Sequence, residues 1–129
     1  MRQRKSRVAV IGTTSWGTTL AIMLSRKGLE VSLWARTEAE AEKLNRRKRN
    51  AARLPGFSFP EGLQATASLD EALDKAGLVI FAVPSQDMRR NIRLVREYLG
   101  SSMLILSVAK GLEVESVQRM SQVISEEVT

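Results

Sequence analysis

Residues 8–21 read VAVIGTTSWGTTLA, and this stretch decides the fold class. The small and branched apolar residues of Val8–Ile11 are typical of a buried strand. Gly12 follows at once, Gly17 comes five positions later, and apolar residues then recur at helical spacing. A strand that turns through glycines into a helix can bind a phosphate, because the helix N-terminus presents N–H groups and a positive dipole to the anion.

The turn departs from the G-x-G-x-x-G pattern at its middle glycine, where Thr14 stands. In such turns the first glycine permits the tight bend, the second lets the backbone approach a pyrophosphate, and the third lets the helix pack on the strand. Gly12 and Gly17 keep the first and third roles. Thr14 is expected to crowd the phosphate and to disfavour a positive φ, because it is β-branched. The backbone N–H groups of Ser15, Trp16 and Gly17 and the hydroxyls of Thr14 and Ser15 are expected to face the anion.

Outward from this turn, strand-like and helix-like segments alternate along the chain. Capping-box patterns at Thr37/Glu40 and Ser68/Glu71 mark two helix starts. Continuous apolar strands separated by helices predict an α/β fold with a doubly wound, mainly parallel Rossmann-type sheet and helices on both faces. The predicted strands are 8–11, 30–35, 63–66, 78–83 and 103–108, and the predicted helices are 16–27, 37 onward, 68 to about 77, 86–99 and 116–128, the last with Val117 on its apolar face.

Ligands bind such sheets outside the carboxyl ends of the strands, so the residues just after each strand are the candidates. Besides the glycine turn, these are Arg36, Pro84–Gln86 and Ala109–Gly111. Arg36 suits a ribose 2′-phosphate, and the first acid, Glu38, already lies in the predicted helix, so the pattern favours NADP over NAD. The other interpretation is that Arg36 is one more solvated arginine.

Lys110 follows the strand at 103–108 and precedes a glycine. Its ammonium group could hold a phosphate or polarise a carbonyl at the ligand edge of the sheet. A lysine in a strand-to-helix loop is also often only solvated, so both interpretations stay open from the residues alone.

The amino-acid composition limits the kinds of metal site and catalytic group that this chain can contain. The 129 residues suit one domain, and they contain no cysteine and no histidine, which excludes disulfides and removes the usual metal ligands and general base. Nine of the twenty Lys and Arg lie in MRQRKSR (1–7) and RRKRNAAR (46–53), which are interpreted as a flexible basic tail over residues 1–6 and a solvated helix end rather than a nucleic-acid interface. No membrane span and no secretory signal are evident, so a cytoplasmic protein is expected.

Taken together, these segments resemble the bacterial NAD(P)-dependent glycerol-3-phosphate dehydrogenases. The glycine turn, with its tryptophan, resembles that family's G-x-G-x-W-G-T-A-L-A segment. Further matches run in order to about Glu127, nearly the whole chain. They are LWAR (33–36), the asparagine-then-L-P-G loop RNAARLPGFSFPEGLQAT (49–66), AVPSQ (82–86) and AKGLE (109–113).

The resemblance implies reduction of dihydroxyacetone phosphate to sn-glycerol 3-phosphate, which feeds phospholipid synthesis. It implies that Ser15 and Trp16 contact the cofactor, that Arg36 contacts its adenosine ribose or 2′-phosphate, and that Lys110 faces both the nicotinamide end and the substrate. The family's proton-donating lysine lies in a C-terminal helical domain expected to be absent here, so no catalytic residue and no turnover are expected of this chain. The expected cofactor-binding residues are Gly12, Thr14, Ser15, Trp16, Gly17, Arg36, Pro84 and Lys110, with Lys110 also substrate-binding and no metal site.

Three other interpretations stay open from the sequence. The chain could be a stand-alone dinucleotide-sensing module, the cofactor domain of another Rossmann reductase, or a basic nucleic-acid binder. The sequence also leaves open the preference between NAD and NADP, a homodimer, and whether a longer native chain continues beyond Thr129.

Overall fold

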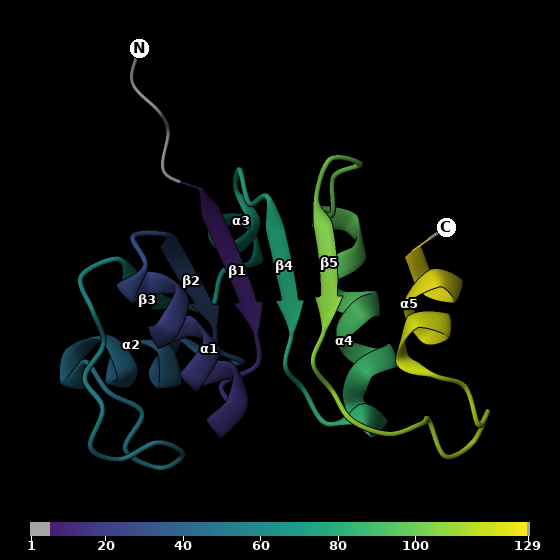
Figure 1. The fold of residues 1–129 in the computed structure, drawn as a ribbon, viewed down its shortest axis with the longest axis horizontal. Coiled ribbons are helices and arrows are strands. Elements are labelled where there is room, and N and C mark those ends of the chain that lie inside the picture. The colour runs from purple at the N-terminus through teal and green to yellow at the C-terminus, as the bar shows by residue number, and fades with distance from the viewer. Residues whose placement is uncertain (1–5, 129) are drawn as a thin grey trace.

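The computed structural model describes residues 6–128. Strands and helices alternate along most of the chain, as the sequence predicts (Figure 1). The strands are β1 (Arg7–Ile11), β2 (Glu30–Trp34), β3 (Leu63–Thr66), β4 (Leu78–Phe81) and β5 (Leu104–Ser107). The helices are α1 (Ser15–Arg26), α2 (Glu38–Arg47), α3 (Leu69–Leu73), α4 (Met88–Val95) and α5 (Met120–Val128), with 3-10 turns η1 (Ser85–Asp87) and η2 (Arg96–Tyr98) flanking α4.

All five strands are parallel and lie in the order β3-β2-β1-β4-β5. The strand order reverses between β1 and β4, which pair with Ile11 opposite Phe81 at their carboxyl ends. A parallel doubly wound sheet forms its ligand crevice at this reversal point. The predicted fold class is therefore confirmed, and the glycine turn after β1 lies at the crevice.

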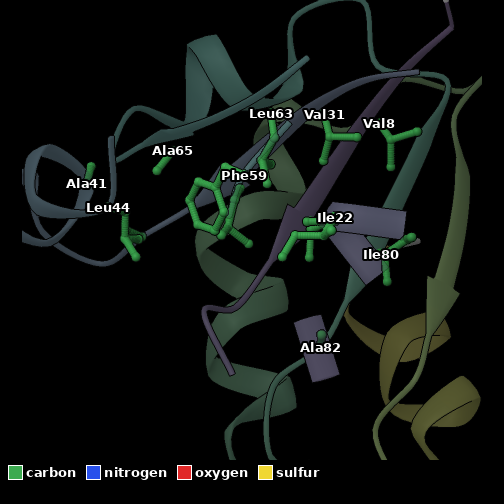
Figure 2. Close-up of a cluster of buried hydrophobic side chains, with 14 residues drawn as sticks. Val8, Ile22, Val31, Ala41, Leu44, Phe59, Leu63, Ala65, Ile80 and Ala82 are labelled. Carbon is green, nitrogen blue, oxygen red and sulfur yellow. The ribbon is translucent and has the colours of Figure 1, made fainter. Parts of the chain in front are cut away.

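The two faces of the sheet carry separate apolar cores. Helices α1 and α2 cover one face, where Ile22 and Leu44 pack with Val31 and Ile80 of the strands (Figure 2). Helices α3, α4 and α5 cover the other face, where Phe81 is fully buried. These helices lie on opposite sides of the sheet in Figure 1.

Strand β5 departs from the expectation of a sheet covered on both faces. Leu104 and Leu106 remain 70% and 45% exposed, although Ile105 between them packs against the core on the other face. Alternate residues of a strand point to opposite faces, so one face of β5 is buried and the other is open.

Helix starts follow local capping where the sequence predicts it. The side chains of Thr37 and Ser68 accept from the backbone N–H groups of Glu40 and Glu71. The last helix was expected from residue 116, but α5 begins at Met120. Val117 has a φ of +58° and is 68% exposed, so its place on an apolar helix face is wrong.

Candidate cofactor site

The glycine turn packs so closely on β4 that its two glycines have no room for side chains. Gly12 has a φ of +122°, and a Cβ there would overlap the Ala82 carbonyl oxygen. A Cβ on Gly17 would overlap the Gly12 carbonyl oxygen. The geometry gives Gly12 the tight bend and Gly17 the close packing of helix on turn, which are the roles that the sequence assigned to them.

Thr14 caps helix α1. Its hydroxyl accepts from the Gly17 backbone N–H at 3.0 Å and donates to the Ala82 carbonyl oxygen at 2.8 Å. Its φ of −68° and ψ of 168° are extended backbone, so the expected conflict with a positive φ does not arise. Thr14 therefore replaces the missing glycine without backbone strain, and it ties the turn to the end of β4.

The donors that can reach an anion are fewer than the sequence suggested. The Gly17 N–H and the Thr14 hydroxyl are engaged with each other, and the Ser15 hydroxyl donates to the Arg53 carbonyl oxygen at 2.7 Å. The first N–H groups of a helix have no partner within it. The backbone N–H groups of Ser15 and Trp16 are thus the donors at this helix N-terminus that these contacts leave for a phosphate.

A buried asparagine holds the turn from the other side. Asn50 is 5% exposed, and its Nδ2 donates to the Thr13 carbonyl oxygen at 3.0 Å and to the Thr18 hydroxyl at 2.9 Å. The backbone carbonyl oxygen of Asn50 accepts from the Leu54 N–H at 2.7 Å, which shapes the loop that carries Arg53. Sequence reasoning gave Asn50 no role; its place in the asparagine-then-L-P-G segment was the available signal.

Two adjoining hollows follow the carboxyl edge of the sheet, and Thr14 and Val83 line both. The larger, about 490 Å³, has a mostly apolar wall, and Lys110 is among its lining residues. The smaller, about 300 Å³, contains Arg36. Volumes in this range suit small-molecule ligands. Of the expected site residues, the larger hollow holds Thr14, Ser15, Trp16 and Lys110, and the smaller holds Gly12, Thr14, Arg36 and Pro84.

Gly17 lies buried beneath the turn and lines neither hollow, so it acts through packing. Gln86, which the sequence places at the ligand edge, also lines neither hollow. Its side chain binds the loop after Lys110.

Arg36, Arg53 and Lys110 are uncompensated cations of the two hollows. All three are exposed, and within residues 6–128 none of their side chains has a hydrogen-bond or ion-pair partner. Arg53 lines the smaller hollow beside Arg36. The same hollow contains Glu40, whose carboxylate accepts from the Thr13 hydroxyl at 2.6 Å. Asp87 also lines this hollow, and its carboxylate pairs with Arg90 at 2.8 Å. Both acids are thus engaged within the protein, which leaves two arginines for an anionic ligand.

Two features are absent from the part of the chain that the structure describes. Residues 6–128 contain no group of three or more acidic side chains placed to hold a metal ion. No helix among them is both long and apolar enough to cross a bilayer.

A family model described as NAD-dependent glycerol-3-phosphate dehydrogenase N-terminus matches residues 7–129. The chain belongs to this family. A glycerol-3-phosphate dehydrogenase [NAD(P)+] of Dehalococcoides mccartyi is 54% identical over 125 residues, which are 96% of this chain and 35% of the relative. That of Chlorobium limicola is 42% identical over 119 residues, which are 92% of this chain and 36% of the relative.

Solved glycerol-3-phosphate dehydrogenases have the same fold. The crystal structure of the Coxiella burnetii protein superposes with a TM-score of 0.90 at 29% identity, over 96% of this chain and 38% of that one. The Saccharomyces cerevisiae protein gives 0.82 at 28% identity, over 97% and 40%. The chain thus spans about a third of the length of the curated relatives it matches.

Proposed function

We propose that this chain is the NAD(P)H-binding domain of an enzyme that reduces dihydroxyacetone phosphate to sn-glycerol 3-phosphate for phospholipid synthesis. The observation that carries the proposal is the meeting of the glycine turn, Arg36 and Lys110 along two adjoining hollows at the reversal point of the sheet. The 54% identity to a dehydrogenase that uses NAD(P) supports the same assignment.

The residues present fit a dinucleotide. The Ser15 and Trp16 N–H groups would receive the pyrophosphate at the N-terminus of α1, where the helix dipole favours negative charge. Arg36, with Arg53 near it, would hold the adenosine ribose, and two cations favour a 2′-phosphate and hence NADP over NAD. The cofactor supplies the hydride when it is bound.

Lys110 would face the nicotinamide end and the substrate. Lys110 lines the larger hollow together with Trp16 and the apolar Ala82 and Val108, which supports this role. Its ammonium group could attract the substrate phosphate or polarise the ketone, but reduction also requires a proton at the developing alkoxide. We assign that proton donor, and the cage for the substrate phosphate, to residues outside this chain.

Calorimetric titration of the 129-residue chain with NADPH and NADH tests the proposal. We expect both to bind and NADPH to bind more tightly. A Gly17→Val variant is the matched control, because its side chain would overlap the Gly12 carbonyl oxygen and displace the turn. No binding by the parent chain, or equal binding by the control when circular dichroism shows it folded, would contradict the assigned site.

The rival interpretations make different predictions. A dinucleotide-sensing module would bind NADPH but would give no turnover when joined to the family's C-terminal domain. A nucleic-acid binder would bind DNA with a steep salt dependence. We expect turnover in the joined protein and no such binding of DNA. The homodimer and the cytoplasmic location stay predictions, which sedimentation and cell fractionation would test.

A further inference from the structure

The Gln86 side chain binds the loop that follows Lys110 as a neighbouring strand would. Its Nε2 donates to the Leu112 carbonyl oxygen at 2.9 Å, and its Oε1 accepts from the Val114 N–H at 3.0 Å. One side-chain amide thus pairs with both backbone groups that flank Glu113. Gln86 lies in η1, directly after the β4 end that forms the cofactor edge.

Arg89 binds Glu113, the residue between those two contacts. Its Nε and Nη2 each lie 2.9 Å from a carboxylate oxygen of Glu113, and Nη2 also donates to Gln118 at 3.0 Å. The two side chains are 18% and 14% exposed, so this two-point pair is largely shielded from water. Hydrogen bonds from Arg89 and then from Ser116 lower the pKa of Glu113 to about 2, which keeps the carboxylate charged at neutral pH.

Backbone hydrogen bonds complete the polar contacts of the loop: the Glu113 N–H donates to the Gln118 carbonyl oxygen at 2.9 Å, and the Val117 N–H donates to the Glu113 carbonyl oxygen at 2.8 Å. The apolar side chains of the loop are solvated, because Leu112, Val114 and Val117 are 46%, 72% and 68% exposed. Val117 also has a φ of +58°, a conformation that a β-branched residue adopts only under constraint. Polar contacts, rather than burial, therefore determine the conformation of this segment.

We infer that Gln86 and Arg89 are positioning residues for Lys110: by fixing residues 112–114, they hold Lys110 at the wall of the larger hollow. The inference rests on the proposed function, which gives Lys110 its ligand. Gln86 and Arg89 act through the loop, and neither lines the hollow.

Amide NMR of the ¹⁵N-labelled 129-residue chain tests this inference. We expect Lys110 and Gly111 to have rigid amides in the parent and mobile amides in Arg89→Ala and Gln86→Ala. Arg93→Ala is the matched control, since Arg93 shares the partner Glu127 with Arg89 but, among the described residues, makes no hydrogen bond or ion pair with residues 112–114. Its Lys110 amide should stay rigid. Arg89→Lys, which restores the charge without the two-point geometry, should restore rigidity only in part.

NADPH titration of the same samples separates positioning from simple stability. We expect the ligand-induced amide shift of Gly17 to persist in all variants and that of Lys110 to be lost in Arg89→Ala and Gln86→Ala. A rigid, fully shifted Lys110 in both variants would overturn the inference, and so would equal loosening in Arg93→Ala. If Arg89→Ala does not fold, Gln86→Ala decides alone, because Gln86 is exposed. Absence of any Gly17 shift in the parent would contradict the proposed function, while the comparison of loop rigidity without ligand would still stand.

Discussion

Thr14 occupies a position where the usual turn has glycine, and the structure gives it a structural role. Its hydroxyl joins the N-terminus of α1 to the end of β4, while the residue also lines both hollows. With the hydroxyl engaged inside the protein, the methyl group is the part that can crowd a ligand. Substitutions can separate the stabilising effect of the hydroxyl from the crowding effect of the methyl group.

We predict that Thr14→Gly tightens NADPH binding by about 1 kcal/mol and lowers the free energy of unfolding by about 1 kcal/mol, since it relieves crowding and loses the cap. Thr14→Ser should keep the stability, because it keeps the hydroxyl, and should still tighten binding. Calorimetry and urea denaturation measure the two effects. Weaker binding by both variants would identify the methyl group as a ligand contact.

Arg36 is predicted to set the cofactor preference. Arg36→Asp should make NADH bind more tightly than NADPH, because aspartate repels a 2′-phosphate and accepts from a 2′-hydroxyl. The expected loss of NADPH binding is about 1.5–3 kcal/mol, the value of a hydrogen bond to a charged group. Arg46→Asp, the same charge change on an exposed arginine of α2 that lines neither hollow, should leave the preference as it was. An unchanged order in Arg36→Asp would make Arg36 a surface residue only.

For single residues, the sequence predicts most of the side chains that line the two hollows but few of the hydrogen bonds that hold the turn. Gly12, Ser15, Trp16 and Arg36 follow strands or begin a helix, so local rules find them. Asn50 reaches Thr13 across 37 positions of sequence, and no local pattern encodes such a contact. The same holds for the Thr14 hydroxyl, whose acceptor is 68 positions away.

Among the elements, α4 and α5 are joined by a set of ion pairs. Arg89 and Arg93 bind Glu127 of α5, and Arg89 also binds Glu113 of the loop before it. These contacts lower the pKa values of Glu113 and Glu127, through hydrogen bonds to Arg89 and to Arg93 respectively. Two ionised carboxylates, one in α5 and one in the loop before it, therefore help to hold this region to α4.

We predict that this region loses stability in acid. A carboxylate whose folded pKa is depressed stabilises the fold above its unfolded pKa, and that contribution disappears as pH falls to the folded pKa. For Glu113 the window runs from its ordinary value of 4.5 down to about 2. Thermal unfolding measured across this window should show a fall in Tm that is smaller in Glu113→Gln, whose amide does not titrate there. An identical acid profile in parent and variant would exclude Glu113 as a source of the loss.

Element types are predicted better than element ends. Each expected strand and helix exists, because apolar periodicity reports burial over many residues. The start of α5 is wrong by four residues, since Val117 continues the helical spacing while its backbone turns through a left-handed conformation. The helix around 86–99 likewise contains α4 with a 3-10 turn at each end.

For the whole molecule, the main expectation is binding without turnover. The isolated chain should bind NADPH yet leave dihydroxyacetone phosphate unreduced, because one exposed ammonium group gives little binding energy in water. Joined to the family's C-terminal domain, it should gain activity, and Lys110→Ala should then lower kcat/KM sharply with NADPH binding mostly kept. Lys27→Ala, at the C-terminal end of α1, is the control for loss of a lysine, and it should leave kcat/KM unchanged. The reaction is measured as the loss of NADPH absorbance. Turnover by the isolated chain would place the proton donor within this chain.

We predict that the open face of β5 makes this domain prone to self-association. β5 is an edge strand of the sheet, so its outer row of backbone groups can pair with another strand. Leu104 and Leu106 add an exposed apolar patch beside this edge. Light scattering should therefore rise with protein concentration, and Leu104→Lys with Leu106→Lys should suppress the rise at little cost in Tm. Leu94→Lys, at a leucine of α4 that is 52% exposed, should not suppress it, and an equal effect there would point to net charge rather than to the strand edge. We therefore expect NADPH affinities measured on this chain to depend on protein concentration.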